Sequence, residues 1–394
     1  MARLYDGDRP NITRLSLKVE GEKITGWLGG QEISGTLKGS AVEFSSGNRK
    51  AKGTLDGNNI RGEVTVGDRT MKWDAARLPP RPSPRVHNFE PKQFHLYFAS
   101  NIKPVLYIAP GDTVRTWTVD AGGADKNGKR LSQGGNPETG PFYVQGALPG
   151  DTLVVKLNKV RLNRDWAGSG NQIMRAALDP WSLGDLKWTP SVPSRWKLDH
   201  AKGVATLEKP TDRLNTFSVP LRPMMGCIGV APGGDNSIRT TDSGRFGGNM
   251  DYNQLVEGTT VYLPVNHLGA LLFVGDGHAA QGDGELTGDA LETSMDVEFT
   301  VDVIPGKQFG QPLAENDDYV ISIGIGGSLD QALQTATSGL MRWLDRDYRL
   351  TSSEAAMVMG FAIRYDVADL VGTQVSIAAK LPKSALAKLK KDPR

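Results

Sequence analysis

The sequence predicts an α+β fold dominated by β-structure: a mixed sheet or sandwich main domain with two C-terminal helices, preceded by a small antiparallel β module. The first observation behind this prediction is the abundance of turn formers, 47 Gly and 23 Pro among 394 residues. The second is a series of short apolar segments separated by Gly- and Pro-containing turns, which is typical of strands. The third is the clear helical periodicity after residue 327.

Residues 1–76 are predicted to form the small antiparallel β accessory module. Leu15, Leu17 and Val19 alternate with polar residues, as in a strand with one buried face. A Gly-Thr-Leu-x-Gly motif occurs at residues 35–39 and again at 53–57. Because the module contains no His and no convergent carboxylates, we interpret it as a structural or binding accessory.

A Pro-rich linker is predicted over residues 77–88, since four Pro residues fall between positions 79 and 84 and favour an extended chain. The main domain then spans residues 89–394. Residues 163–215 are rich in Trp and Pro with weak periodicity, which predicts a long ordered excursion. Strands are expected on either side of it, at 105–108, 113–119, 143–145, 152–157, 261–264, 270–274 and 295–303.

Two helices are predicted near the end of the chain. Ser328 with Gln331, and Thr351 with Glu354, have the spacing of capping boxes, which satisfy the first free backbone N–H groups of a helix. After the first box, apolar residues recur at helical spacing, namely Leu329, Leu333, Ala336, Leu340 and Trp343.

The charge balance bears on the partners of the protein. The 46 Lys and Arg residues nearly match the 44 Asp and Glu residues, which argues against a nucleic-acid-binding surface. No apolar run reaches the length of a transmembrane helix, so no membrane partner is expected. Cys227 is the only cysteine, which leaves the redox compartment undecided. The N-terminal residues have no apolar signal core, so the protein is expected to be cytoplasmic, or exported with its signal already removed.

The segment 274–285 is the strongest candidate for a functional site. It combines Asp276, His278, Asp283 and Glu285 with small residues, directly after an apolar run. Asp276 and His278 are two residues apart, so in an extended segment their side chains share a face and can bind one ion. The alternative is an ordinary turn whose Asp side chains bond to their own backbone.

Other positions carry side chains of the same chemistry. Asn249 and Asp251 share the spacing of two, Asp120 follows a predicted strand, and His95 lies just inside the main domain. Imidazole nitrogen and carboxylate oxygen together suit Zn²⁺ or a similar divalent ion. For His95 the alternative is a packed, hydrogen-bonded side chain.

Three stretches of the main domain resemble the acetamidase/formamidase family: NPETGPFYVQGA at 136–147, PMMGCIGVAP at 223–232, and the run from GGNMD at 247–251 to residue 292. The likeness extends over roughly residues 90–385. It implies hydrolysis of a small carboxamide to a carboxylate and ammonia, a metal-dependent site, and a β-dominated fold that forms oligomers. Gln145 stands where many members of the family have Glu, which bears on the substrate or the rate.

From these residues we expect a divalent metal ion, Zn²⁺ ahead of Ca²⁺, held by Asp120, Asp251, Asp276 and His278, with His95 as a further ligand. Such an ion lowers the pKa of bound water and polarises the amide carbonyl. Glu285 or Glu292 is expected to take a proton from water and pass it to the leaving nitrogen.

Substrate binding is assigned to Gly226, Cys227, Gly229 and Asn249. The N–H groups of residues 226–229 are expected to lie in a turn and to stabilise the oxyanion. The expected partners are a small-molecule amide and further copies of the chain in a homo-oligomer, a dimer or larger. Two alternatives stay open: a non-catalytic β-rich binding protein with a structural Ca²⁺ site, and an amidase that uses Cys227 as its nucleophile.

Overall fold

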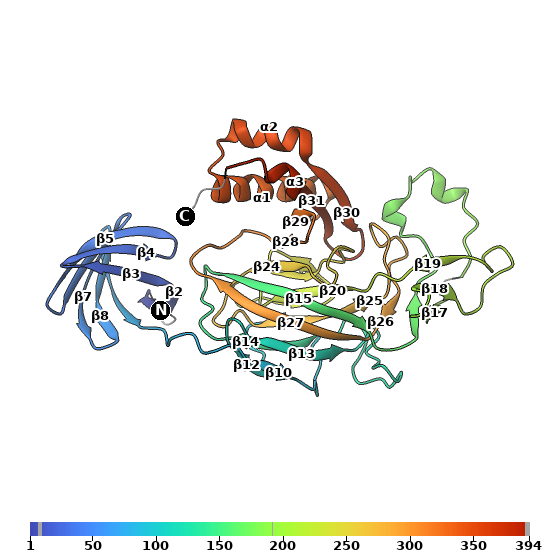
Figure 1. The fold of residues 1–394 in the computed structure, drawn as a ribbon, viewed down its shortest axis with the longest axis horizontal. Coiled ribbons are helices and arrows are strands. Elements are labelled where there is room, and N and C mark those ends of the chain that lie inside the picture. Colours follow the sequence, from blue (N-terminus) through green and yellow to red (C-terminus); the bar gives the residue numbers. More distant parts are fainter. Residues whose placement is uncertain (7–9, 191, 391–394) are drawn as a thin grey trace.

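The N-terminal region is a single antiparallel sheet that curls on itself (Figure 1). The computed structural model describes residues 1–6, 10–190 and 192–390 of the chain. The sheet has the order β2-β1-β9-β8-β7-β6-β5-β4-β3. Its strands are β1 (Ala2–Tyr5), β2 (Pro10–Thr13), β3 (Leu15–Glu20), β4 (Lys23–Leu28), β5 (Gln31–Lys38), β6 (Ala41–Ser46), β7 (Arg49–Asp56), β8 (Asn59–Val66) and β9 (Arg69–Ala76).

The alternating pattern of this region places one side chain in two inside the curled sheet. In β6 the residues Val42 and Phe44 are buried and their neighbours are exposed. The two copies of the Gly-Thr-Leu motif fall in β5 and β7. At Gly35 of the first copy, a Cβ atom would lie 2.0 Å from the carbonyl oxygen of Glu43, so the close approach of the strands there requires glycine.

The N-terminal sheet contacts the rest of the chain through Arg14, between β2 and β3. Its guanidinium donates to both carboxylate oxygens of Asp151, at 2.9 and 2.7 Å, and to the carbonyl oxygen of Gly146 at 2.7 Å. The carboxylate is fully buried and the Arg14 side chain is 18% exposed. A bidentate pair of this kind fixes both distance and direction.

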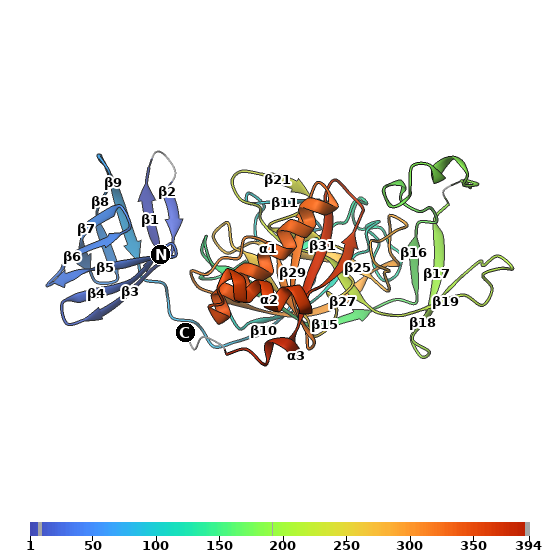
Figure 2. The same ribbon diagram turned by 90° about the horizontal axis from the view of Figure 1, so that it is seen from above.

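The remainder of the chain is a sandwich of two sheets (Figures 1 and 2). The first sheet has nine strands in the order β10-β13-β27-β15-β24-β28-β29-β31-β30. Its strands are β10 (Val86–Asn88), β13 (Thr113–Thr118), β15 (Thr152–Leu162), β24 (Thr260–Pro264), β27 (Met295–Ile304), β28 (Leu313–Glu315), β29 (Tyr319–Gly326), β30 (Arg364–Asp369) and β31 (Val375–Pro382).

The second sheet carries the central strands of the functional site. It runs in the order β19-β18-β17-β16-β26-β25-β20-β23-β22, with β12 and β14 joined alongside β25. Its strands are β12 (Leu106–Ile108), β14 (Thr139–Val144), β16 (Trp166–Ser169), β17 (Ser194–Asp199), β18 (Val204–Leu207), β19 (Ser218–Pro220), β20 (Met224–Val230), β22 (Ser243–Gly244), β23 (Gly247–Asn249), β25 (Leu272–His278) and β26 (Glu292–Thr293). A small separate sheet pairs β11 (Tyr97–Ala99) with β21 (Ser237–Arg239).

The main core lies between the two sheets. Phe142 of β14 packs edge-on against Phe299 of β27, with ring centroids 5.3 Å apart, and Phe98 packs in the same way against Phe273. Every residue of β20 and β25 is buried, as expected for strands covered on both faces. The predicted β-dominated sandwich is confirmed.

The helices cover the far end of the first sheet. The long helix α1 (Leu329–Tyr348) lies on β29 and β31, followed by α2 (Ser352–Ala362) and the short α3 (Lys383–Leu386). Ser328 and Thr351 cap α1 and α2 as predicted, but only Thr351 and Glu354 form the complete capping box, because the side chain of Gln331 accepts from the backbone N–H of Gly327. The predicted apolar stripe is rotated: Ala336, Leu340 and Trp343 are buried, whereas Leu329 and Leu333 are about two-fifths exposed. None of the described helices has the length and apolar character needed to cross a membrane.

The excursion predicted at residues 163–215 forms strands β16 to β18, with two single turns of 3₁₀-helix at Arg175–Ala177 and Ser182–Gly184. It projects from the sandwich at the end opposite the N-terminal sheet (Figure 2). It therefore stands beside β25 and β26, where the candidate site is built.

Candidate active site

The candidate active site is built on the antiparallel pair β20 and β25, whose register places Asp276 opposite Gly226. A Cβ atom on Gly226 would lie 2.4 Å from Oδ1 of Asp251 and 2.9 Å from both Oδ2 of Asp276 and Cε1 of His278. These are impossible distances for a real Cβ. Gly226 is therefore the floor on which the three side chains converge.

Asp276 and His278 of β25 meet Asp251, which follows β23. Nε2 of His278 lies 3.5 Å from Oδ1 of Asp276 and 3.9 Å from Oδ1 of Asp251. All three atoms are buried and have no hydrogen-bond partner among the described residues. Asp276 and Asp251 both adopt positive φ, +54° and +39°, a strained backbone that is common at functional sites.

Two asparagines hold the second oxygen of each carboxylate. The side-chain amide of Asn136 donates to Oδ2 of Asp276 at 2.8 Å and to Oδ1 of Asn249 at 2.9 Å. Asn249 in turn donates to Oδ2 of Asp251. Because these bonds occupy the Oδ2 atoms, each Oδ1 atom is left facing the imidazole.

The orientation of His278 is set by Gln281. The amide nitrogen of Gln281 donates to the carbonyl oxygen of Asp251, so its Oε1 atom faces Nδ1 of His278, at 2.8 Å. Nδ1 must then carry the proton of the neutral imidazole, which leaves the lone pair on Nε2, the tautomer that a metal-binding histidine needs.

Three more carboxyl groups complete the cluster. Glu292 pairs with His278 across β25 and β26, and its Oε1 atom lies 3.2 Å from Nε2 of the imidazole. Glu285 lies in the loop between these strands, and Asp369 ends β30. The ligand atoms fall into three overlapping sets, each within 4.8 Å: Asp251–Asp276–His278, His278–Glu285–Glu292, and Asp251–Glu285–Asp369.

The electrostatics of this cluster are unusual for a protein interior. Burial is the largest cause that raises the pKa of the Asp251 and Glu285 carboxyls, and neighbouring carboxylates add to it. The same cause raises the pKa of Glu292 and of Asp369 to about 7. Burial would lower the pKa of His278, but Glu292 and Asp276 raise it well above its ordinary value.

Glu138, at the end of the loop before β14, is a further carboxyl group without a partner. Its side chain is fully buried and neither oxygen has a hydrogen-bond partner among the described residues. It lies over Gly275, where a Cβ atom would be 2.6 Å from Oε2. Burial, and then the charge of Asp276, raise the pKa of Glu138 well above its ordinary value.

The donor set fits a divalent cation. Five carboxyl groups surround one imidazole, and such a concentration of acid in the interior is costly unless a cation compensates it. The unpartnered Oδ1 atoms of Asp276 and Asp251 lie 3.5 and 3.9 Å from Nε2 of His278, and Oε1 of Glu292 lies 3.2 Å from it. Ligand atoms in a tetrahedral Zn²⁺ site, at about 2.1 Å from the ion, lie about 3.4 Å apart.

A cavity of about 530 Å³ opens onto the cluster. Its lining includes Asp251, Asp276, Glu285 and Glu292, together with Arg239 at the rim. A small molecule in this cavity therefore reaches the carboxylates directly. We call this the acidic cavity.

Two predicted ligands lie outside the cluster. Asp120 forms an ion pair of 2.7 Å with Arg164, and its other oxygen accepts a hydrogen bond from the backbone N–H of Ala124. Because a buried guanidinium neutralises it, Asp120 has no free oxygen to offer. His95 is half-buried and makes a T-shaped ring contact with Phe273, and its buried, unpartnered Nε2 atom belongs to none of the three ligand sets.

The turn predicted at residues 226–229 is wrong, because these residues form the middle of strand β20. Cys227, Ile228 and Gly229 pair with β25 on one side and β23 on the other, so the strand is internal to the sheet. Cys227 is fully buried, and burial together with Glu138 raises the pKa of its thiol well above the ordinary value. These features count against Cys227 as a nucleophile.

Of the other predicted substrate-binding residues, Asn249 lines the acidic cavity, whereas Gly229 does not. A Cβ atom at Gly229 would lie 2.7 Å from the backbone nitrogen of Gly248, so its role is close strand packing. The side chain of Gln145 is exposed at the end of β14, away from the cluster.

Sequence reasoning missed several residues of the site: Asn136, Glu138, Arg164, Gln281 and Asp369. Asn136 and Glu138 lie in the first family-like stretch, which could have identified them. Gln281 lies in the segment 274–285, three residues after His278. Asp369 is distant in sequence from every other acidic residue of the cluster, and no motif around it indicates a role in the site.

Comparison with known proteins agrees with this architecture. Residues 230–317 match the model of the acetamidase/formamidase family. The chain is 25% identical over 300 residues to a formamidase of Methylophilus methylotrophus, covering 61% of this chain and 73% of that one. It is 30% identical over 221 residues to an acetamidase of Mycolicibacterium smegmatis, covering 43% of this chain and 53% of that one.

Among solved structures, the acetamidase of Yersinia enterocolitica superposes with a TM-score of 0.68 at 27% identity, over 78% of this chain and 94% of that one. The aligned segments span between 53% and 73% of the length of the curated relatives.

Proposed function

Since the chain belongs to the acetamidase/formamidase family, we propose that it hydrolyses a carboxamide to a carboxylate and ammonia with the help of a divalent metal ion. The observation that carries the proposal is the convergence of Oδ1 of Asp251, Oδ1 of Asp276 and Nε2 of His278, all buried and unpartnered. These atoms would hold the ion. Zn²⁺ fits this mixture of nitrogen and oxygen donors.

A bound Zn²⁺ supplies a Lewis acid that polarises the amide carbonyl and makes water more acidic. The residues of the chain do the rest. Glu292 takes the proton of the attacking water and gives it to the departing nitrogen, because its Oε2 atom is unpartnered and its carboxyl group lines the acidic cavity. Glu285 lines the same cavity and is the second candidate for this step. Asn136 and Asn249 keep the ligating carboxylates in place.

The test is ammonia release from formamide and acetamide, with metal content measured on the same samples. We expect about one Zn²⁺ per chain, loss of activity on chelation, and recovery on adding Zn²⁺. His278→Ala should lower kcat/KM by about 100-fold or more. His267→Ala is the matched control, since its imidazole bonds to the carbonyl oxygen of Pro232 at 2.7 Å. Full activity of both the chelated protein and His278→Ala would refute the metal-dependent mechanism.

The second candidate is a non-catalytic protein with a Ca²⁺ site, because carboxylate oxygens from Glu285, Glu292 and Asp369 accompany the imidazole. The visible spectrum of a Co²⁺-substituted sample distinguishes the zinc site from the calcium site, since a four-coordinate site with a nitrogen ligand gives intense visible absorption. A site that takes Ca²⁺ in preference to Zn²⁺, in a protein that releases no ammonia from any amide, would favour the Ca²⁺-binding function.

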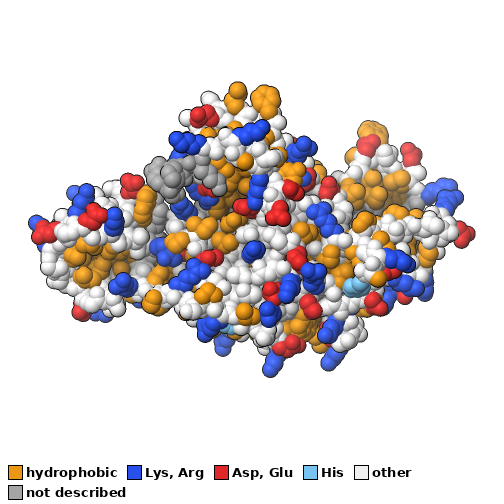
Figure 3. Space-filling view, in the orientation of Figure 1, with side chains coloured by type: hydrophobic (Ala, Val, Ile, Leu, Met, Phe, Trp, Pro, Cys, Tyr) orange, Lys and Arg blue, Asp and Glu red, His pale blue; other side chains and the backbone are white. Residues whose placement is uncertain are grey.

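We also propose that the chain forms a homo-oligomer. Helix α2 presents Met357 and Phe361, one turn apart, 68% and 88% exposed. Apolar side chains gather over this helix at the top of the molecule in Figure 3, and such patches mark protein contacts. Sedimentation should give a dimer or larger for the wild type and a smaller species for Phe361→Glu. A monomeric wild type at micromolar concentration would contradict the proposal.

A further inference from the structure

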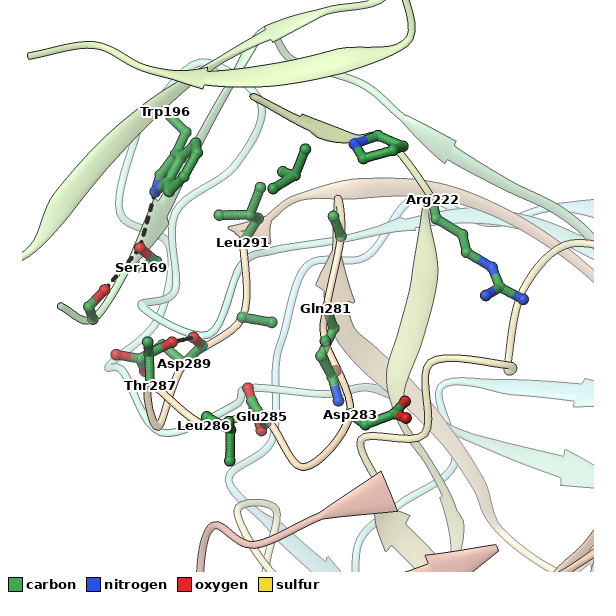
Figure 4. A pocket seen from close by; sticks show the side chains of 16 residues that line it. Ser169, Trp196, Arg222, Gln281, Asp283, Glu285, Leu286, Thr287, Asp289 and Leu291 are labelled. Carbon is green, nitrogen blue, oxygen red and sulfur yellow. Dashed lines mark hydrogen bonds between the residues drawn. The ribbon is translucent and has the colours of Figure 1, made fainter. Parts of the chain in front are cut away.

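A second cavity, of about 560 Å³, adjoins the acidic cavity. Glu285 and Asp289 line both, so the two spaces share a border at these carboxylates. In Figure 4, Glu285 and Asp283 lie toward one end of this second cavity, and Trp196 and Leu291 lie toward the other. We call it the apolar cavity.

The walls of the apolar cavity are largely hydrocarbon. Trp196 comes from the excursion strand β17, Val219 comes from β19, and Ala290 and Leu291 come from the loop before β26. The indole N–H of Trp196 is bonded to Oγ of Ser169 at 3.0 Å. The ring is thereby held in place as a wall of the cavity (Figure 4).

Two of the charged side chains that line the cavity already have hydrogen-bond partners in the protein. Arg222 donates to Oε1 of Gln254 at 2.6 Å, and Asp283 accepts from Nδ2 of Asn253 at 2.7 Å. Both keep their charge, but these bonds hold them to neighbouring side chains, and most of the remaining lining away from the Glu285 border is apolar. The space can stabilise an occupant by burying its apolar surface.

We propose that the apolar cavity receives the hydrocarbon part of the substrate, so that the substrate is a carboxamide with an apolar acyl group much larger than acetyl. This inference rests on the proposed amidase function. The reacting amide lies at the acidic cavity, and the chain or ring of the acyl group passes the Glu285–Asp289 border toward Trp196. A volume of about 560 Å³ is in the range that holds drug-sized ligands, far more than a methyl group fills.

The kinetic test compares acetamide, butanamide, hexanamide and 3-phenylpropanamide. Burial of each added methylene group should raise kcat/KM by roughly three- to fourfold, so hexanamide should exceed acetamide by about 100-fold. A value of kcat/KM that is flat or falls along the series would overturn the proposal.

Gly282 provides a variant that fills the cavity. It lines the cavity, its Cβ position has no atom within 4 Å, and its φ is not in the left-handed region. Gly282→Leu should lower kcat/KM for hexanamide at least tenfold more than it lowers kcat/KM for acetamide. Gly184→Leu is the matched control, because Gly184 is exposed, lines neither cavity and has equally open space at its Cβ position. Trp196→Ala, which removes the indole wall of the cavity, should also reduce the preference for hexanamide.

Calorimetric titration of hexanamide into the wild type and Gly282→Leu, under conditions without turnover, separates the two proposals. If no amide is hydrolysed but the wild type binds hexanamide at least tenfold more tightly than the variant, the amidase function fails and the cavity assignment stands. If acetamide is hydrolysed but hexanamide binds both proteins equally, the assignment fails and the amidase function stands. If hexanamide neither binds nor reacts, the assignment fails.

Discussion

Oδ1 of Asp276 and Nε2 of His278 lie 3.5 Å apart, both buried and both without a hydrogen-bond partner among the described residues. The two residues come from one strand, two positions apart. Their second polar atoms are held by Asn136 and Gln281. The protein therefore orients this pair so that Oδ1 of Asp276 and Nε2 of His278 are both available to bind one ion.

The first prediction concerns the floor of the site. Gly226→Ala adds a methyl group that would sit 2.4 Å from Oδ1 of Asp251, so the ligand atoms must separate. We expect metal affinity and kcat/KM to fall by about 100-fold while the circular dichroism spectrum stays native. The measurement is Zn²⁺ affinity by competition with a chromogenic chelator. Gly168→Ala, in β16, is the control, because no atom lies within 4 Å of its Cβ position; equal affinities of the two variants would contradict the prediction.

The second prediction concerns Gln281, which orients the imidazole of His278 but is not itself a metal ligand. Gln281→Ala removes the acceptor of the Nδ1 proton, and losses of about 10- to 100-fold in metal affinity are typical of such changes. Gln308→Ala, which loses a bond to the carbonyl oxygen of Val265, should bind metal like the wild type. An unchanged affinity for Gln281→Ala would show that the backbone alone positions His278.

The third prediction concerns acid stability and Asp112. Burial raises the pKa of this carboxyl, but hydrogen bonds from the backbone of Ala109, from His87 and from the backbone of Arg85 outweigh burial and lower it below its usual value of 3.8. A lowered folded-state pKa stabilises the protein fully above the unfolded value, and this contribution disappears as pH falls through the folded value.

Asp112→Asn should therefore be less stable than the wild type at pH 7 by about 1–3 kcal/mol, and the difference should shrink below about pH 4. Urea unfolding at pH 7, 4 and 3 measures it. Asp56→Asn, at an exposed site, is the control for general charge effects. A difference that stays constant or grows on acidification would contradict the assignment.

The fourth prediction concerns the contact between the N-terminal sheet and the sandwich. Arg14→Ala leaves the fully buried carboxylate of Asp151 without its cation, which should cost about 3 kcal/mol. Arg3→Ala breaks a more exposed pair with Asp74 and should cost less than about 1 kcal/mol. Both values come from urea unfolding. The double variant Arg14→Ala/Asp151→Asn should regain part of the loss, and no recovery would mean that Arg14 acts by packing alone.

Local patterns were sufficient for much of the fold. Ser328 and Thr351 mark the starts of both long helices, since a capping box depends only on residues three positions apart. Local rules of this kind could not predict which face of α1 packs on the sheet. Ala332 and Ala336 face β29 because small residues allow the helix to approach Gly324, whose Cβ position lies 2.0 Å from the carbonyl oxygen of Ala332.

The site was only partly predictable for a related reason. The spacing of two brings Asp276 to His278, and the structure adds Asp251 from the second such pair. Asp120 has the same chemistry, but its cation, Arg164, comes from another strand connection, and nothing local in the sequence shows the pairing. Asp369 reaches the cluster only because β30 ends beside the loop at Gly284. Long-range strand pairing decides both cases.

The glycines of β20 and β25 are expected to tolerate substitution less well than small residues in a protein core usually do. In a hydrocarbon core, the large side chains are the ones that resist replacement. Here Gly226, Gly275 and Gly277 occupy fully buried strands, and each would bring a Cβ within 2.7 Å of an atom of Asp251, Glu138 or Met295. In a saturation scan of these two strands, losses as steep as those at Asp276 and His278 should also fall at positions that have no side chain to lose.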